Sequence, residues 1–155
     1  MRPRPATHAD AAAIAALIRA AFAMQSVPTD PPPGALRETA ATVAALIARG
    51  GGTVIVADGA MVGCVLWQEK EGGLYFGRLS VHPAHRRQGI ARALVAAVEA
   101  EARRRRLPRV HLSARIPLLD NRRLFAACGF VETALNTHDG YSAPTSVVME
   151  KILRP

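Results

Sequence analysis

The stretch from Leu74 to Pro108 constrains the fold more than any other part of the chain. Residues 74–81 have the composition of a β-strand, and Pro83 ends that strand. Gly89 then opens a long helix, which ends at Leu107-Pro108 and has apolar residues at helical spacing. A strand that leads through a short loop into such a helix is typical of mixed proteins in which helices pack on a sheet. The chain is therefore expected to belong to the α/β (α+β) class.

Patterns on either side of this stretch predict the other elements. Thr7 and Asp10 have the spacing of a capping box, so a first helix is expected to follow them, and the residues before them to form an edge strand. Asp58-Gly59 and Gly72-Gly73 are turn signals, which makes residues 53–81 an antiparallel meander. The expected helices cover residues 14–22, 36–49, 90–106 and 120–127, and the further strands cover residues 53–57, 61–69, 109–115, 130–135 and 145–152.

Length and composition fit a single domain that spans residues 1–155. Half of the residues are apolar and 21% are charged, which supplies a core and differs from a disordered chain. No apolar run approaches the roughly 20 residues that cross a bilayer, and no signal-peptide core is present. Cys64 and Cys128 have the spacing of neither a metal site nor a disulfide framework. We therefore expect a cytoplasmic protein that has no membrane contact and no metal, with both cysteines reduced.

The charge balance points to an anionic partner. Lys and Arg number 20 against 12 Asp and Glu, which gives a net charge of +8, and Lys70 and Lys151 are the only lysines. Such a surface favours nucleic acid or a small molecule that carries phosphate. The run Arg103–Arg106 falls in the last turns of a predicted helix, where cations complement the helix dipole. Because aromatic residues make up only 5% of the chain and no DNA-reading motif is visible, nucleic-acid binding is the disfavoured alternative.

The loop before the third predicted helix is a candidate phosphate site. The first amides of a helix lack an internal acceptor, and the helix dipole adds partial positive charge there. Gly89 and Ala91 allow a ligand to approach this backbone, and Arg86, Arg87 and Arg92 add charge. The segment is neither a Walker loop nor a dinucleotide fingerprint. It therefore predicts a pyrophosphate site at the start of the helix.

Three motifs in sequence order resemble those of the GCN5-related N-acetyltransferase (GNAT) family. Arg86-x-x-Gly89-x-Ala91 is similar to the acetyl-CoA motif of that family. Asn121-x-x-Leu124-Phe125-x-x-Cys128-Gly129-Phe130 resembles its second signature, a helix that ends in Gly-Phe. Arg4-Pro5-Ala6-Thr7, with Asp10 and Ile14, looks like the usual start of these chains. The resemblance covers nearly the whole sequence and implies a mixed, mostly antiparallel sheet of six to seven strands, flanked by about four helices, with a splay between the fourth and fifth strands.

The resemblance also implies acetyl-CoA as cosubstrate and a set of residues that bind it. Pantetheine would lie in the splay along the backbone of Leu79, Ser80 and Val81, which would also polarise the thioester carbonyl. Asn121 would contact the cofactor arm, and Phe125 of the same signature is also expected to bind the cofactor. The amides and side chains expected at the pyrophosphate are those of Arg86, Arg87, Gln88, Gly89, Ile90, Ala91 and Arg92.

The sequence departs from the family pattern where acid–base catalysis is expected. Phe125 stands where many relatives carry a tyrosine that protonates the departing thiolate, and neither strand at the splay contains a carboxylate. His111 is the candidate base because the pKa of an imidazole lies near neutrality, and Ser113 on the same strand face is expected to hold a water. Tyr141, in the loop between the last two strands, is the candidate donor.

The acceptor is the least constrained part of the reaction. We expect direct attack by a primary amine of a small molecule in a ternary complex, and no acidic cluster is visible that would attract polyamines. Arginines at positions 78, 115, 122 and 123 favour an acceptor that resembles an amino acid. A non-catalytic acyl-CoA-binding sensor, a transferase of longer acyl groups, and a homodimer remain open alternatives.

Overall fold

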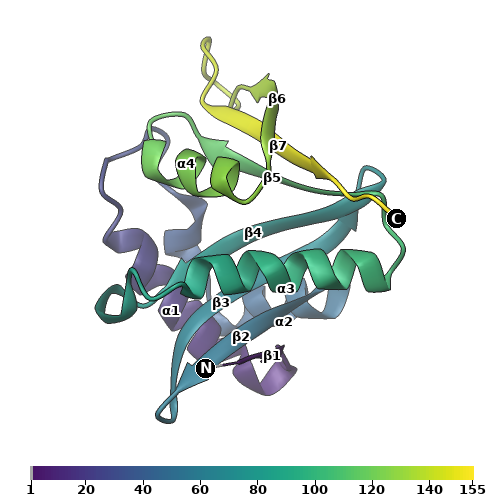
Figure 1. Cartoon of the computed structure of the whole chain (residues 1–155). Helices are drawn as coiled ribbons and strands as arrows, with labels where there is room; N and C mark the ends of the chain where they lie inside the picture. The colour runs from purple at the N-terminus through teal and green to yellow at the C-terminus, as the bar shows by residue number, and fades with distance from the viewer. Residues whose placement is uncertain (1) are drawn as a thin grey trace.

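A computed structural model of the chain describes residues 2–155 (Figure 1). Short 3₁₀ turns cover His8–Asp10, Gly34–Arg37 and Pro83–His85. The helices are α1 (Ala11–Ala23), α2 (Ala40–Arg49), α3 (Ile90–Arg104) and α4 (Leu119–Ala127). The strands are β1 (Pro3–Pro5), β2 (Gly51–Ala57), β3 (Ala60–Lys70), β4 (Gly73–Val81), β5 (Arg109–Arg115), β6 (Val131–Asn136) and β7 (Ser146–Ile152).

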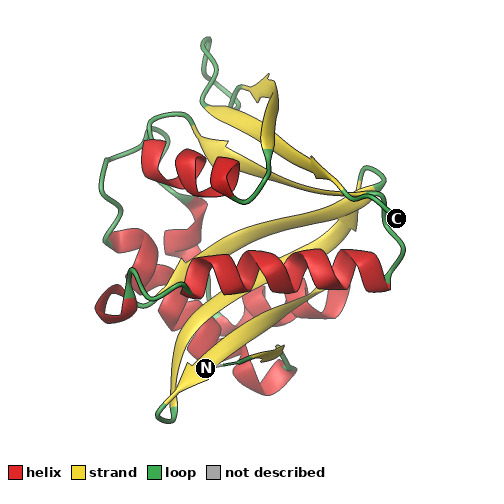
Figure 2. Ribbon diagram, in the orientation of Figure 1, coloured by secondary structure: helices red, strands yellow, loops and turns green. Residues whose placement is uncertain are grey.

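The seven strands form one sheet in the order β1-β2-β3-β4-β5-β7-β6. Every neighbouring pair is antiparallel except β4 and β5, which run parallel. Helices α1 and α2 cover one face of the sheet, and α3 crosses the other (Figures 1 and 2). This arrangement confirms the predicted element order and the predicted mixed, mostly antiparallel sheet.

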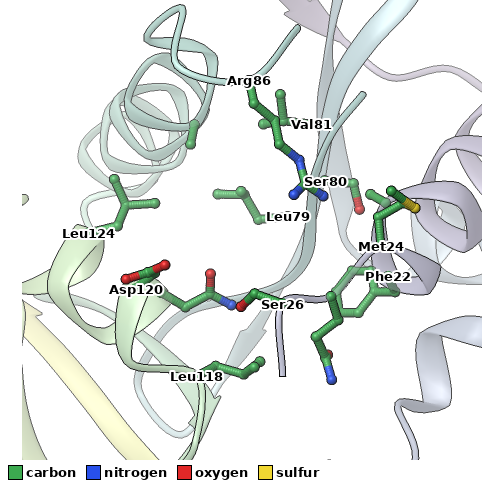
Figure 3. A pocket seen from close by; sticks show the side chains of 14 residues that line it. Phe22, Met24, Ser26, Leu79, Ser80, Val81, Arg86, Leu118, Asp120 and Leu124 are labelled. Carbon is green, nitrogen blue, oxygen red and sulfur yellow. The ribbon is translucent and has the colours of Figure 1, made fainter. Parts of the chain in front are cut away.

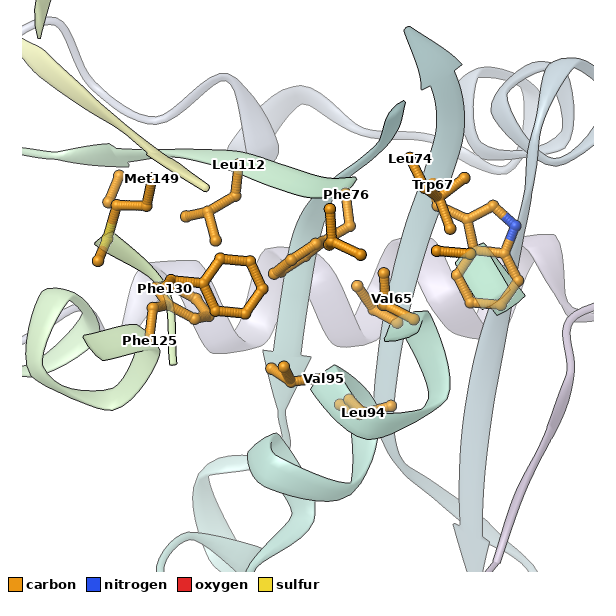
Figure 4. Close-up of a cluster of buried hydrophobic side chains, with 14 of the residues drawn as sticks. Val65, Trp67, Leu74, Phe76, Leu94, Val95, Leu112, Phe125, Phe130 and Met149 are labelled. Atoms are coloured by element: carbon orange, nitrogen blue, oxygen red, sulfur yellow. The ribbon is translucent and has the colours of Figure 1, made fainter. Parts of the chain in front are cut away.

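Two apolar cores hold the helices on the sheet. On the α3 side, Leu94 and Val98 pack on Phe76 and other strand residues, and the same core takes in Phe125 of α4 and Phe130 (Figure 4). On the opposite face, Ile14, Ile18 and Val43 of α1 and α2 pack against Val54, Cys64 and Leu66. Because alternate residues of β2 and β3 feed the two cores, these two strands are covered on both faces.

A bulge and a splay break the sheet at one place. Cys64 pairs with Ser80 and Leu66 pairs with Gly77, so two residues of β4, Arg78 and Leu79, face Val65 alone. Arg78 has a φ of +57°, as the irregular backbone of such a bulge permits. Beyond the bulge, β4 and β5 separate: they pair only at Leu74 with Val110 and at Tyr75 with His111. The predicted splay between the fourth and fifth strands is thereby confirmed.

Some predicted boundaries differ from the structure. The second helix begins at Ala40 and not at residue 36, because Thr39 caps it by accepting a hydrogen bond from the Thr42 amide at 3.2 Å. The turn before β4 places Glu71 and Gly72 at positive φ, so Gly73 already belongs to the strand. Among residues 2–155, no helix combines the length and the apolar character needed to cross a membrane.

Candidate functional site

The start of α3 leaves amide donors free for a ligand. Gly89 precedes the helix with a φ of +79°, a conformation that a glycine adopts without strain. The first backbone hydrogen bond of the helix runs from the Ala93 amide to the Gly89 carbonyl at 3.0 Å. The amides of the preceding three residues therefore point out of the helix end without an internal acceptor. A negatively charged group placed here gains hydrogen bonds and the favourable helix dipole.

Three arginines next to these amides lack partners. Arg86, Arg87 and Arg92 line a cavity of about 250 Å³ at the helix start, together with Gly89 and Ile90. Within residues 2–155, none of these three guanidinium groups makes an ion pair or a side-chain hydrogen bond, whereas arginines elsewhere do. Unpaired cations beside free amides make this cavity suited to a diphosphate.

A second cavity of about 240 Å³ leads from the helix start into the splay (Figure 3). One wall is the end of β4 with Leu79, Ser80 and Val81, and α4 provides Asn121 and Leu124 opposite. The Arg86 side chain projects into the space between these walls (Figure 3). Because β4 has no neighbour on this side, its backbone polar groups are available to a bound chain of similar extension. We call this cavity the splay cleft.

Most of the residues predicted to bind the cosubstrate lie along these two cavities. They are Leu79, Ser80, Val81, Arg86, Arg87, Gly89, Ile90, Ala91, Arg92 and Asn121. Gln88 is exposed and Phe125 is buried, and neither lines the cavities. Phe125 packs edge to face on Phe76, with ring centroids 5.8 Å apart. Phe125 of the second signature therefore contributes to the apolar core beneath α4.

None of the three side chains predicted for acid–base work lines the splay cleft. His111 is only 3% exposed and packs edge to face on Tyr75, where β4 and β5 still pair. Its Nε2 lies 2.8 Å from the Lys70 carbonyl, which can only accept, so this nitrogen carries the proton. Burial lowers the pKa of His111. Ser113, two residues further along β5, is exposed.

Tyr141 ties the β6–β7 loop to the loop between α1 and α2. Its hydroxyl donates to Asp30 Oδ1 at 2.5 Å, and this bond raises the pKa of the phenol. Arg115 reaches the same loop by donating to the Pro31 carbonyl. The end of β5 and the β6–β7 loop are thus both hydrogen-bonded to the loop between α1 and α2, which Figure 1 shows leaving the end of α1.

Sequence reasoning missed several residues of the site. Phe22, Met24 and Ser26, from the end of α1 and the following loop, line the splay cleft, as does Asp120 (Figure 3). The proline-rich sequence between α1 and α2 does not indicate that this loop lines the cleft, because only the tertiary fold brings the loop there. Glu38 was also missed: it is 7% exposed and accepts a hydrogen bond from Arg78 Nε at 3.0 Å.

The remaining charged and nucleophilic groups limit the kinds of chemistry that the site can carry out. Arg104 and Arg105 of the basic run pair with Glu101 at 2.7 and 2.6 Å, which lowers the pKa of that carboxyl to about 2. Burial raises the pKa of the Cys64 thiol to about 12, so Cys64 is a core residue and no nucleophile. Among residues 2–155, no three His, Cys, Asp or Glu side chains group so that they could hold a metal ion.

A sheet splayed beside a helix start that is free to bind phosphate is the architecture expected of an acyltransferase of the predicted family. The model of the acetyltransferase (GNAT) family matches residues 14–130, and the chain therefore belongs to that family. No curated protein matches the sequence.

Solved structures share the fold. The ribosomal-protein-alanine N-acetyltransferase of Brucella melitensis is 20% identical, with 99% of this chain and 100% of that chain covered and a TM-score of 0.77. The PaiA N-acetyltransferase of Thermoplasma acidophilum, in complex with coenzyme A, is 15% identical, with 98% of each chain covered and a TM-score of 0.79. The protein yncA of Salmonella typhimurium, with acetyl-CoA, is 22% identical, with 100% of this chain and 95% of that chain covered and a TM-score of 0.76.

Proposed function

We propose that the protein transfers an acetyl group from acetyl-CoA to a primary amine of a small molecule, by direct attack in a ternary complex. The observation that carries the proposal is the continuity of the two cavities, which run from the free amides and unpaired arginines of α3 to the bulge of β4. A diphosphate fits the first cavity and an extended arm fits the second. The coenzyme complexes of the Thermoplasma and Salmonella proteins, which share the fold, support the same choice of cosubstrate.

In this proposal, the helix start holds the diphosphate and β4 holds the arm. Arg86, Arg87 and Arg92 neutralise phosphate charge, and the backbone of Leu79 to Val81 pairs with the amides of pantetheine. The thioester then lies at the bulge, where the irregular backbone leaves a polar group of β4 without a partner in the sheet. An amide donor aimed at the thioester oxygen there would stabilise the tetrahedral oxyanion.

The transfer needs a neutral amine and a route for one proton. The amine nitrogen forms a bond to the carbonyl carbon, the carbon–sulfur bond breaks, and coenzyme A leaves as a thiolate, which takes up a proton. The acid–base roles of His111, Ser113 and Tyr141 stay predictions, since none of them lines the splay cleft. We propose that water carries the proton, so that positioning and oxyanion stabilisation supply most of the rate.

Calorimetry and a turnover assay test this function together. Titration of the folded protein with acetyl-CoA is expected to give one binding event, and a panel of primary amines is expected to release coenzyme A with at least one acceptor. Binding without turnover on every amine would favour the acyl-CoA sensor. The absence of binding at millimolar acetyl-CoA would overturn the assignment of both cavities.

A further inference from the structure

A third cavity lies on the other face of β4, beneath α2. Its volume is about 190 Å³, and its lining includes Leu46, Leu66, Gln68, Tyr75, Gly77 and Arg78. Leu66 belongs to the core that α1 and α2 form on this face, so the cavity opens on the side of the sheet away from α3. This volume is below the roughly 300–1,000 Å³ usual for drug-sized ligands, which favours a small occupant. We call it the α2 cavity.

The bulge of β4 separates the α2 cavity from the splay cleft. Arg78 lines the first and Leu79 lines the second, and these consecutive residues both face Val65. Gly77 has no side chain, and the Tyr75 hydroxyl lies 3.7 Å from the position that a Cβ of Gly77 would take. A molecule in the α2 cavity therefore approaches the bulge from the face of the sheet that α1 and α2 cover.

Glu38 holds the guanidinium of Arg78 in a fixed orientation. Arg78 Nε donates to Glu38 Oε2 at 3.0 Å, while Glu38 Oε1 accepts from the Thr42 hydroxyl at 2.9 Å. The buried carboxylate is thus engaged on both oxygens. The two Nη groups of Arg78 make no hydrogen bond within residues 2–155. A guanidinium fixed through Nε, with its Nη groups free, is suited to bind a carboxylate.

The rest of the lining is mainly an apolar wall, with positive charge beside it. Leu46, Leu66 and the Tyr75 ring provide apolar surface, and the Lys70 ammonium, outside the lining, lies 4.7 Å from the centre of that ring. Among residues 2–155, no acidic side chain lines the cavity, and the nearby Glu38 carboxylate is already engaged by Arg78 and Thr42. This environment favours an anionic group attached to an apolar one and disfavours polyamines.

We propose that the α2 cavity binds the acceptor, and that the acceptor is an α-amino acid with an apolar side chain. The carboxylate binds the Nη groups of Arg78, the side chain packs on Leu46 and Leu66, and the amine meets the thioester at the bulge. The products are an N-acetyl amino acid and coenzyme A, and the proton lost by the amine is balanced by the thiol formed. The inference rests on the proposed acetyl transfer and specifies its acceptor.

The test compares apolar amino acids with analogues that lack the carboxylate. Coenzyme A release is measured with L-leucine, L-methionine and L-phenylalanine, with leucinamide and isoamylamine, and with L-lysine and L-glutamate. Leucine is expected to exceed leucinamide and isoamylamine by at least about tenfold in kcat/KM, which corresponds to about 1.4 kcal/mol. Lysine and glutamate are expected to be poorer still.

Two variants and a control connect this preference to the α2 cavity. Arg78→Lys keeps the positive charge but loses the paired Nη donors of the guanidinium. It is expected to raise the KM for the apolar amino acid about tenfold and to leave the affinity for acetyl-CoA unchanged. Leu46→Trp narrows the cavity without touching Arg78 and is expected to reduce kcat/KM most for the largest side chain. Arg49→Met, at the exposed end of α2, is the matched control and is expected to have no effect.

The outcomes separate the two proposals. Equal turnover of leucine, leucinamide and isoamylamine would overturn the carboxylate site while leaving acetyl transfer intact. A preference for lysine or glutamate, or an unchanged KM in both Arg78→Lys and Leu46→Trp, would also overturn the acceptor assignment. Binding of acetyl-CoA without release of coenzyme A on any amine would overturn acetyl transfer itself, and the acceptor with it.

Discussion

The Tyr141 hydroxyl donates a hydrogen bond to Asp30 Oδ1 at 2.5 Å and so joins two loops that are 111 residues apart in the sequence. One loop connects β6 and β7. The other connects α1 and α2, and its first residues line the splay cleft. The ring of Tyr141 also lies edge to face with His138, at a centroid distance of 6.4 Å. The bond fixes the separation of these loops, and with it the approach to the splay.

Tyr141→Phe tests whether this hydroxyl positions the loops or donates a proton. Because the proton of the hydroxyl is directed to Asp30, we expect a rise of about threefold to tenfold in the KM of the amine and a kcat within about twofold of wild type, as an exposed charge-assisted hydrogen bond would give. Asp30→Asn should give a similar KM. A fall of a hundredfold in the kcat of Tyr141→Phe alone would instead identify Tyr141 as the acid.

Arg86→Glu tests the diphosphate site. Arg86 projects into the splay cleft with no ion-pair partner within residues 2–155, so charge reversal should weaken acetyl-CoA binding about tenfold to a hundredfold, and the loss should shrink as salt is added. Arg49→Glu is the matched control, because Arg49 is exposed at the end of α2 and lies outside both cavities. Calorimetry at two ionic strengths measures the effect. Equal affinities for the two variants would contradict the assignment.

Gly89→Ala tests whether the backbone at the start of α3 binds the ligand. Gly89 and Gly59 have φ values of +79° and +77°, and a Cβ on either would meet no atom within 4 Å. Alanine should therefore cost a similar 1–2 kcal/mol of strain at both positions, or roughly 2–8 °C in Tm. Only Gly89→Ala should also lose acetyl-CoA affinity, by about tenfold, since Gly59 lies in the β2–β3 turn. Similar affinities in both variants would argue against a backbone site.

His111 gives the stability of the protein a pH dependence near neutrality. Burial lowers its pKa in the folded state below the ordinary value of about 6.5, so the unfolded chain binds more protons between the two values. The free energy of unfolding should therefore decrease as the pH falls from about 6.5 through the folded-state pKa of His111. Asp10 and Glu101, whose pKa values are about 2, contribute at lower pH.

His111→Gln should remove most of this decrease, because glutamine retains a donor for the Lys70 carbonyl but does not titrate. Denaturant unfolding of both proteins at pH 5, 6, 7 and 8 measures the difference. An unchanged pH profile would show that another group is responsible. A kcat that collapses in this variant at every pH would indicate that His111 acts as the base.

The sequence predicted best the features that local residues determine. The helix of α3 and the meander of β2 to β4 follow from apolar spacing and from turns such as Asp58-Gly59. Gly89 and the arginines around it indicated where a cavity lies at the start of α3, and phosphate binding there stays a prediction. The start of α2 was wrong because the capping bond between Thr39 and Thr42 competes with apolar residues upstream.

The proposed acceptor side could be predicted from the sequence only in part. Of the four arginines expected near the acceptor, Arg78 lines the α2 cavity, whereas Arg122 pairs with Glu132 at 2.9 Å and Arg123 with Asp120 at 3.4 Å, and neither lines it. Glu38 and Arg78 are 40 residues apart, and no local pattern joins them. Such a pair depends on how α2 lies across the sheet, which apolar periodicity alone does not specify.

The start of α3 offers main-chain amides to its ligand, and every amino acid except proline supplies the same group there. Other side chains at that end of the molecule can therefore change while nucleotide binding is kept, provided that the glycine turn and the neighbouring arginines are kept. The pocket below α2 depends instead on the ends of particular side chains, so single changes there can redirect the enzyme to a new amine. Descendants of one ancestor would then keep a common donor and diverge in what they modify.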